Sequence, residues 1–148
     1  MSAVTIVVRA ARAQDAAALA DLSTQLGYPA TPEAITRRLA QIHTRGAGAV
    51  LIAADASGRV LGWTHVVTRV SLEQDAHAEL AGLVVDASAR CAGIGTQLLA
   101  AAEQWTRAQG FDLMRVRSNV VRERAHGFYR RAGYVERKRQ VVFEKSLG

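Results

Sequence analysis

The chain has 148 residues, of which 49% are hydrophobic, and this is the size and composition of one ordinary globular domain. Its 19 Lys and Arg outnumber its 13 Asp and Glu, and the formal net charge is +6. A single cysteine, Cys91, excludes an internal disulfide and a multi-cysteine metal site. No stretch resembles a signal peptide or a membrane span, so we expect a cytoplasmic protein that holds no metal.

In chain order, the first predicted elements are a strand and two helices. Residues 5–9 predict the strand, and Asp15 opens a helix whose apolar residues recur at helical spacing until Gly27. Thr31 and Pro32 have the pattern of an N-cap followed by a first helical proline. They predict a second helix that ends before Gly46.

Three strands and a long helix come next. Residues 50–54 and 60–67 predict two strands, and the segment 55–58 between them has the composition of a hairpin turn. Residues 80–85 are apolar and end in β-branched residues, which predicts the third strand. A tight loop leads from this strand into a helix that runs to Gln109.

The last predicted elements are a strand over residues 113–117, a helix over 122–132 and a pair of strands within 134–144. Helices that lie between meandering and crossover strands imply a mixed sheet with helices on both faces, an α/β (α+β) fold. No repeat, low-complexity tract or linker interrupts this order. We therefore predict a single domain over residues 1–148.

The loop before the long helix is suited to binding a phosphate. Gly93 and Gly95 free the backbone, so that successive N–H groups can converge on an anion where the unpaired amides of a helix N-terminus also point. Leu98 stands where a dinucleotide fingerprint needs its third glycine, and no Gly-Lys-Ser/Thr triplet of a P-loop follows. Both common nucleotide motifs are therefore excluded. The simpler alternative to phosphate binding is that the glycines only allow the chain to turn.

Basic residues are concentrated in the C-terminal third. Nine Arg and Lys between residues 115 and 139 face only Glu123 and Glu136. This charge would attract a nucleic acid or a polyanionic small ligand. No helix-turn-helix, zinc-finger or RNP pattern accompanies it, so we expect no nucleic-acid partner. Solvated arginines on helix faces and edge strands are the simplest explanation.

Two segments resemble the GNAT N-acetyltransferase superfamily. Residues 90–95, Arg-Cys-Ala-Gly-Ile-Gly, resemble its acetyl-CoA loop, which has the pattern Arg/Gln-x-x-Gly-x-Gly/Ala after a strand. Residues 117–134 resemble the segment that follows the superfamily's fifth strand, and the order of elements is also similar. The resemblance implies a GNAT-like, mostly antiparallel sheet of six to seven strands, with acetyl-CoA as the co-substrate and no metal.

The resemblance also implies a coenzyme site. Strand backbone would pair with the pantetheine arm, the loop would hold the pyrophosphate, Asn119 would hydrogen-bond the pantetheine, and Tyr129 would stand near the sulfur. The residues implied are Leu83, Val84, Val85, Arg90, Cys91, Ala92, Gly93, Ile94, Gly95, Thr96, Asn119 and Tyr129. Relatives often carry Gly and a basic residue where Cys91 and Ala92 stand, so backbone amides and the helix dipole would carry more of the binding. A buried strand, a turn cap and a core ring are the structural alternatives.

Acetyl transfer to an amine needs a base, because most amines are protonated at neutral pH. Glu79 precedes Arg90 by eleven positions, the interval at which several GNAT members carry a catalytic glutamate, so it is the candidate base, directly or through a water. Tyr129 is protonated at pH 7 and is the candidate acid for the departing thiolate. A solvated strand edge or a salt bridge is the alternative for Glu79. Cys91 as an acyl nucleophile is disfavoured, because no histidine is near it in the sequence.

We predict that the acceptor is a primary amine of a small molecule. The residues expected to face it are Tyr28, Pro29, Glu33, Trp63, Glu73 and Asp75. Residues 134–143 faintly resemble aminoglycoside acetyltransferases, but similar ends occur in members that act on amino acids, polyamines or protein amines, so a protein or peptide acceptor stays open. A catalytically inactive acyl-CoA-binding regulatory module is the alternative of another class. Strand edges near the C-terminus could pair between two copies in a homodimer.

Overall fold

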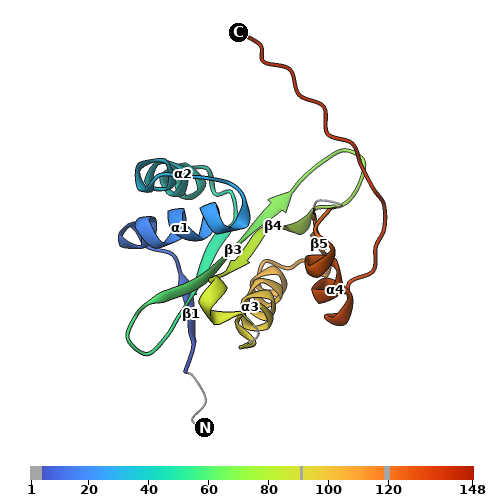
Figure 1. Ribbon diagram of the computed structural model, residues 1–148. Helices are drawn as coiled ribbons and strands as arrows, with labels where there is room; N and C mark the ends of the chain where they lie inside the picture. The colour runs from blue at the N-terminus through green and yellow to red at the C-terminus, as the bar shows by residue number, and fades with distance from the viewer. Residues whose placement is uncertain (1–4, 91, 119–120) are drawn as a thin grey trace. The chain divides into compact units, whose positions relative to one another are not determined.

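The structure is a computed structural model that describes residues 5–90, 92–118 and 121–148 (Figure 1). The chain divides into two compact units after Arg117. The first unit contains the whole sheet described here and the first three helices, α1 to α3. The second unit, from Ser118 to Gly148, contains helix α4 and the C-terminal tail, which we define as residues 134–148.

Five strands form one sheet in the order β1-β2-β3-β4-β5. They are β1 (Val7–Ala10), β2 (Ala49–Ala54), β3 (Val60–Arg69), β4 (His77–Val85) and β5 (Met114–Val116). The first four strands pair antiparallel in succession, and β5 joins β4 in parallel. A parallel neighbour needs a crossover connection, which α3 supplies between β4 and β5. The predicted mixed, mostly antiparallel sheet is therefore confirmed.

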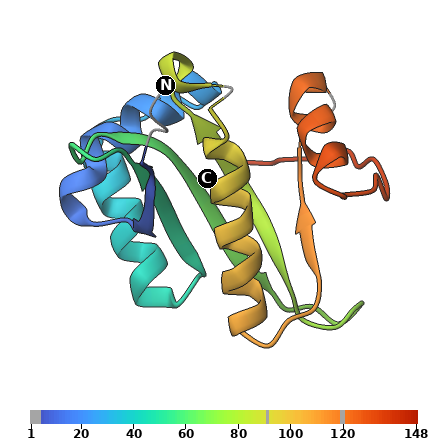
Figure 2. The same cartoon turned by 90° about the horizontal axis from the view of Figure 1, so that it is seen from below.

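Helices cover both faces of this sheet. The covering helices are α1 (Ala16–Leu26), α2 (Pro32–Arg45) and α3 (Ile94–Ala108), all in the first unit. The second unit contains α4 (Glu123–Arg131). Figure 2 shows α1 and α2, in blue and cyan, on one face and α3, in gold, on the other. Within the described ranges, no helix combines the length and the apolar character that crossing a membrane requires.

Strand β2 shows how one segment serves both layers. Ile52 belongs to a buried cluster with Leu19 of α1, while its neighbour Ala53 belongs to a cluster with Leu98 of α3. Successive side chains of a strand point to opposite faces, and here both faces are covered. This explains why β2 is a continuous apolar run without polar alternation.

The predicted helix boundaries are confirmed around α2. The Thr31 hydroxyl accepts a hydrogen bond from the Ala34 N–H at 3.1 Å, and Pro32 is the first helical residue, where its missing N–H costs nothing. Gly46 ends the helix in the left-handed region, with φ of 59°. Gly27 ends α1 in the same way, with φ of 104°.

The predicted pair of strands within residues 134–144 is wrong, so the sheet has five strands instead of six or seven. The described tail contains neither helix nor strand, and Figure 1 draws it as an extended trace. Four consecutive charged residues, 136–139, separate its apolar residues, and Glu136 forms an ion pair with Arg139 at 2.7 Å. Because charged side chains favour water, they oppose the burial that a packed hairpin needs. Val142 and Phe143 are 83% and 90% exposed.

A close approach between the sheet and α3 depends on Gly62 of β3. A Cβ atom at this position would lie 2.8 Å from the Val84 carbonyl oxygen and 3.1 Å from a methyl carbon of Leu98. The first neighbour is backbone of the adjacent strand and cannot rotate away. The glycine therefore lets β4 and α3 pack closely against β3.

We expect Gly62→Ala to lower the free energy of unfolding by about 1–3 kcal/mol, because the added methyl overpacks this contact. Chemical denaturation measures the change. Thr68→Val, at an exposed position of the same strand, is the matched control and should change stability by less than about 0.5 kcal/mol. Equal stability of the Gly62 variant and the control would contradict the packing argument.

Candidate active site

Strand β4 contains a bulge that opens one of its edges. On β3, His65 pairs with Gly82 and the next residue, Val66, pairs with Leu80, so Ala81 is an extra residue on β4. On its other side, β4 pairs with β5 only over Ala78 to Leu80. Beyond the bulge, residues 81–85 have no partner strand on that side among the described residues. We call this segment the free edge.

The free edge offers extended backbone to a ligand. Unpaired N–H and C=O groups of an edge can bind an extended chain as though it were an added strand. Leu83 and Val85 pack their side chains against the cluster of Ile94 and Leu98 on the α3 side. Val84 is only 4% exposed. The side chains are therefore held in place while the backbone edge stays open, and the predicted pantetheine residues Leu83, Val84 and Val85 all lie on it.

The loop that follows β4 is braced by Asp86. Its carboxylate accepts hydrogen bonds from the Ser88 N–H at 2.8 Å and the Ser88 hydroxyl at 2.7 Å, which closes a single 3-10 turn at Ala87–Ala89. The Ser88 hydroxyl is the largest cause of a pKa of Asp86 below its ordinary value. Gln25 of α1 accepts a hydrogen bond from the Ala87 N–H at 3.0 Å. These bonds fix the start of the loop to the first helix.

The loop ends at an uncapped helix N-terminus. Gly93, the N-cap residue of α3, lies in the left-handed region, with φ of 79°, and as a glycine it supplies no side-chain cap. The Gln97 N–H donates a hydrogen bond of 3.1 Å to the Gly93 carbonyl oxygen. The N–H groups that precede Gln97 in the first turn have no acceptor within the helix. Apart from its neighbours along the chain, no atom of the described residues lies within 4 Å of a Cβ built on Gly93. This helix start has the geometry of an anion site.

Of the remaining loop residues, Ile94 is buried and Gly95 is half-buried. Ala92, Gly93 and Thr96 are exposed, and the Arg90 Nε donates a hydrogen bond of 3.4 Å to the Val85 carbonyl at the end of the free edge. The structure therefore brings Arg90 and residues 92–96 to one end of β4. Cys91 and Asn119 lie outside the described residues, and their predicted roles stay predictions.

Glu79 is buried before the bulge, at the opposite end of β4 from the loop. It is 7% exposed, and its Oε1 accepts a hydrogen bond of 2.6 Å from the Arg117 Nε and lies 3.9 Å from the Arg69 Nε. As a base, Glu79 would have to use its other oxygen or exchange the contact with Arg117. Glu79 therefore makes the salt bridges that the alternative interpretation expected, while its catalytic role stays a prediction.

Tyr129 lies in α4 of the second unit. Its ring makes edge-to-face contacts with Phe128, at 5.2 Å between ring centroids, and with Tyr134, at 6.0 Å. Burial raises the pKa of the Tyr129 hydroxyl above its ordinary value, and the positive charge of Arg122 partly opposes this shift. The hydroxyl therefore keeps its proton at neutral pH, as an acid must.

The residues predicted to face the acceptor are spread over three places. Tyr28, Pro29 and Glu33 are exposed around the connection from α1 to α2, and Glu73 and Asp75 are exposed between β3 and β4. Trp63 lines a cavity of about 160 Å³ between α1, α2 and the sheet. Its Nε1 is buried without a hydrogen-bond partner in the part of the chain that the structure describes.

His65 lines the same cavity as Trp63. Its Nε2 lies 3.2 Å from the Ala47 carbonyl oxygen, and burial lowers the pKa of His65 below its ordinary value. The imidazole is therefore neutral at pH 7. The cavity can take a small group that accepts a hydrogen bond from the indole.

A larger hollow, of about 720 Å³, opens beside Asp86 on the α1 side. Arg9 and Asp15 line it and form an ion pair with one another at 2.8 Å. The hydrogen bond from Arg9 holds the pKa of Asp15 below its ordinary value, against the effect of burial. Because Arg9 and Asp15 neutralise one another, we assign no ligand to the hollow.

Comparison with known proteins identifies the family. A model of the acetyltransferase (GNAT) family matches residues 16–134. The chain belongs to the GNAT acetyltransferase family. The predicted resemblance is therefore confirmed, and the chain is an acetyl-CoA-dependent N-acetyltransferase.

Relatives of this GNAT chain include aminoglycoside enzymes. Aminoglycoside N(6')-acetyltransferase type 1 of Stenotrophomonas maltophilia is 32% identical over 146 residues, which cover 95% of this chain and 93% of that protein. The structure of aminoglycoside N-acetyltransferase AAC(6')-Iy in complex with CoA has a TM-score of 0.84 at 20% identity, covering 96% of this chain and 95% of that chain. AAC(6')-Ih from Acinetobacter baumannii also has a TM-score of 0.84, at 18% identity, covering 97% and 100%.

Three arginines near Glu79 were not predicted as site residues of this GNAT chain. They are Arg69 of β3, Arg115 of β5 and Arg117, which follows β5. One signal for two of them is in the sequence, because the alternation of apolar and basic residues over 113–117 puts Arg115 and Arg117 on one face of a strand. Their neighbourhood with Glu79 depends on the parallel register of β4 and β5, which the sequence does not reveal.

A charge reversal at the helix start tests the predicted pyrophosphate loop. Thr96 is exposed in the first turn of α3, so we expect Thr96→Glu to weaken coenzyme A binding about tenfold or more by repulsion. An acid near a helix N-terminus favours the helix, so the melting temperature without ligand should not fall. Isothermal titration calorimetry measures the affinity.

Gln104→Glu adds the same charge at an exposed position farther along the same helix and serves as the control. It should bind coenzyme A within about twofold of the wild type, because the field of a screened surface charge falls off within about 10 Å. Equal affinity of the two variants would place the pyrophosphate elsewhere.

Proposed function

We propose that this protein transfers the acetyl group of acetyl-CoA to a primary amine of a small molecule by direct attack of the amine. The observation that supports this most is the free edge of β4 beside an uncapped helix start, in a chain 32% identical over 146 residues to an aminoglycoside N(6')-acetyltransferase. The relative acts on an amine of a small molecule, as its name states. The same class of acceptor is our proposal for this chain.

The residues present fit acetyl-CoA. Backbone of residues 83–85 would take the pantetheine arm, and the open space beside Gly93, with the N–H groups of the first turn of α3, would take the pyrophosphate. When bound there, acetyl-CoA supplies an acetyl thioester, which is activated toward amines. A backbone N–H near Leu83 is the candidate donor to the carbonyl oxygen on which negative charge builds.

Two side chains are proposed to move protons. Glu79, directly or through a water, takes a proton from the ammonium form of the acceptor, which leaves the nitrogen lone pair free. The nitrogen then bonds to the carbonyl carbon and loses its second proton to water as the carbon–sulfur bond breaks, and Glu79 returns the first proton to solvent. Tyr129 donates its hydroxyl proton to the departing thiolate and is reprotonated from solvent. No covalent enzyme intermediate is needed.

An acceptor screen tests the proposed function. Purified protein with acetyl-CoA should release thiol in the presence of at least one small primary amine from a panel of aminoglycosides, polyamines and amino acids, read with a thiol reagent. Thermal protection by acetyl-CoA is measured in parallel. Protection with turnover only on peptides or proteins would favour the protein-amine alternative, and protection without turnover would favour a regulatory module that binds acyl-CoA.

Substitution of the two proton-transfer candidates tests the mechanism. We expect Glu79→Gln and Tyr129→Phe each to lower kcat about a hundredfold, because proton transfer by a positioned side chain contributes on that order. The KM for acetyl-CoA should change less than about threefold, since neither residue is assigned to the phosphates. Steady-state kinetics on the best acceptor of the screen measures both constants. Unchanged kcat in either variant would remove that residue from the mechanism.

The pH dependence of kcat tests Tyr129 as the acid. Because burial raises the pKa of Tyr129 above its usual value of about 10, the protonated form persists through mildly alkaline pH. Loss of activity through Tyr129 should therefore begin only above about pH 10, and kcat of the wild type should not decline between about pH 7 and 9. A decline in that range that disappears in Tyr129→Phe would contradict the raised pKa.

A further inference from the structure

Three arginines gather around Glu79 on the face of the sheet opposite α3. Glu79 pairs in register with Arg115 on β5 and with Val67 on β3, two residues before Arg69. Met114, the neighbour of Arg115, contacts the Thr106 hydroxyl of α3 through its sulfur at 3.5 Å. Alternation along β5 therefore turns Arg115 away from α3. We call Arg69, Arg115 and Arg117 the arginine cluster, and all three belong to the first unit.

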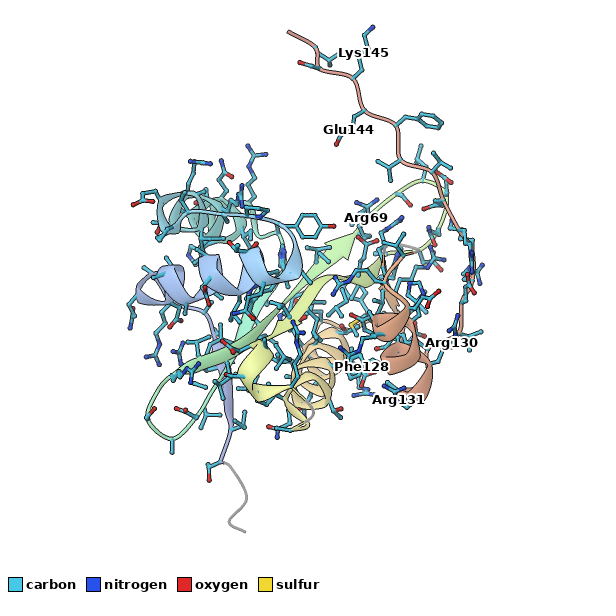
Figure 3. The ribbon with its side chains drawn as sticks, viewed as in Figure 1. Arg69, Phe128, Arg130, Arg131, Glu144 and Lys145 are labelled. Carbon is cyan, nitrogen blue, oxygen red and sulfur yellow. The ribbon has the colours of Figure 1, made fainter. Side chains whose placement is uncertain are left out.

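Glu79 balances only part of this positive charge. Its carboxylate is 2.6 Å from the Arg117 Nε and 3.9 Å from the Arg69 Nε, so one negative charge stands between two guanidinium groups, and Arg115 is the register partner of Glu79 on β5. The side chains of Arg69 and Arg117 are about half exposed, which leaves them accessible to a ligand. Figure 3 labels Arg69 at the end of β3. The cluster thus brings three basic side chains together with one carboxylate.

A second observation points to a missing acceptor of hydrogen bonds. The Nε of Arg115 is buried, and it has no hydrogen-bond partner among the residues that the structure describes. A buried donor without a partner is costly, and buried polar groups in native proteins almost always have one. An anionic oxygen of a bound ligand would satisfy this donor. Planar guanidinium groups match carboxylate and phosphate oxygens closely.

The position of the cluster relates it to the acceptor. Glu79 lies two residues before the bulge at Ala81, where the free edge begins. Under the proposed function, the amine approaches the thioester at this part of β4. The arginines would then surround the body of the acceptor. An acceptor with only positive charges would meet repulsion from them.

We propose that the arginine cluster binds an anionic oxygen group, a carboxylate or a phosphate, carried by the same molecule as the acceptor amine. This rests on the proposed function and narrows it to zwitterionic or acidic amines. Glu73 and Asp75 are exposed on the loop between β3 and β4 and are the nearby carboxylates in sequence that would favour a cationic acceptor instead. They make no charge pair with the cluster in the described structure, whereas Glu79 does.

Matched acceptors test this inference. The first pair is β-alanine and β-alaninamide, and the second is O-phosphoethanolamine and ethanolamine, so that within each pair the main change is loss of the anion. We expect kcat/KM to be about tenfold to a hundredfold higher for the anionic member of at least one pair, because charge-assisted hydrogen bonds are worth that much. The pair that shows the preference identifies the anion. Equal values within both pairs, or higher values for the neutral members, would overturn the inference.

Variants assign the preference to the cluster. Arg115→Gln should reduce kcat/KM for the preferred anionic acceptor about tenfold or more and change the neutral partner less than about threefold. Arg69→Gln, at a half-exposed side chain, should act in the same direction without endangering the fold. Arg37→Gln removes the same charge from an exposed position of α2 and should retain the full preference. Equal losses on both acceptors in the two cluster variants would show a structural role and overturn the assignment.

A binding measurement separates this inference from the proposed function. If no acceptor releases thiol, the proposed function fails, but the cluster can still be tested by thermal shift with the four acceptors in the presence of coenzyme A. Protection of the wild type by an anionic acceptor, lost in Arg115→Gln and kept in Arg37→Gln, would support the anion site. Equal protection by anionic and neutral acceptors would overturn it.

Discussion

The bulge at Ala81 is the constraint on which the rest of the site depends. A β-bulge bends its strand and increases the local twist, so a strand with a bulge cannot continue a regular ladder on both of its sides. Here β4 pairs with β5 over Ala78 to Leu80, and the pairing ends directly before the extra residue. The open backbone therefore begins at the extra residue, where the ladder with β5 ends.

An open edge is useful only if it is also rigid. Leu83 and Val85 are anchored on the α3 layer, while Val84 is buried. Gly62 brings β3 close to the Val84 carbonyl, and α1 holds the following loop through Gln25. The backbone is therefore arranged before any ligand arrives, which reduces the ordering cost of binding. The same packing gives the predicted coenzyme loop a fixed position at one end of the strand.

Local signals predicted most of the first unit. Thr31 and Pro32 begin α2, Gly46 ends it, and the glycines before α3 lie at its start, because caps and periodicity act over a few residues. The bulge could not be predicted in the same way. Ala81 stands in an apolar run, and its unpaired state follows from the register of two neighbouring strands. Only the adjacent Gly82 was a weak local sign of it.

The wrong prediction of strands in the tail and the failure to predict the arginines near Glu79 both come from long-range effects. The apolar residues of the tail, such as Val142 and Phe143, have the composition of a strand, but a strand also needs an edge to pair with and a surface to cover it. Arg115 and Arg117 looked like part of a solvated basic segment. Their neighbourhood with Glu79 is created by the parallel pairing of β4 with β5, across more than thirty positions of sequence separation.

The choice of acceptor has to come from side chains such as these arginines, because enzymes with different site residues share this fold. At 18% to 20% identity and a TM-score of 0.84, the solved relatives preserve the arrangement of strands and helices while most side chains differ. A common fold carries different specificities through the residues placed on it. The coenzyme side of the proposed site would be built mainly from backbone, which tolerates sequence change. The proposed acceptor side is built from side chains, and there one carboxylate with three arginines near it would favour a molecule that brings its own negative charge.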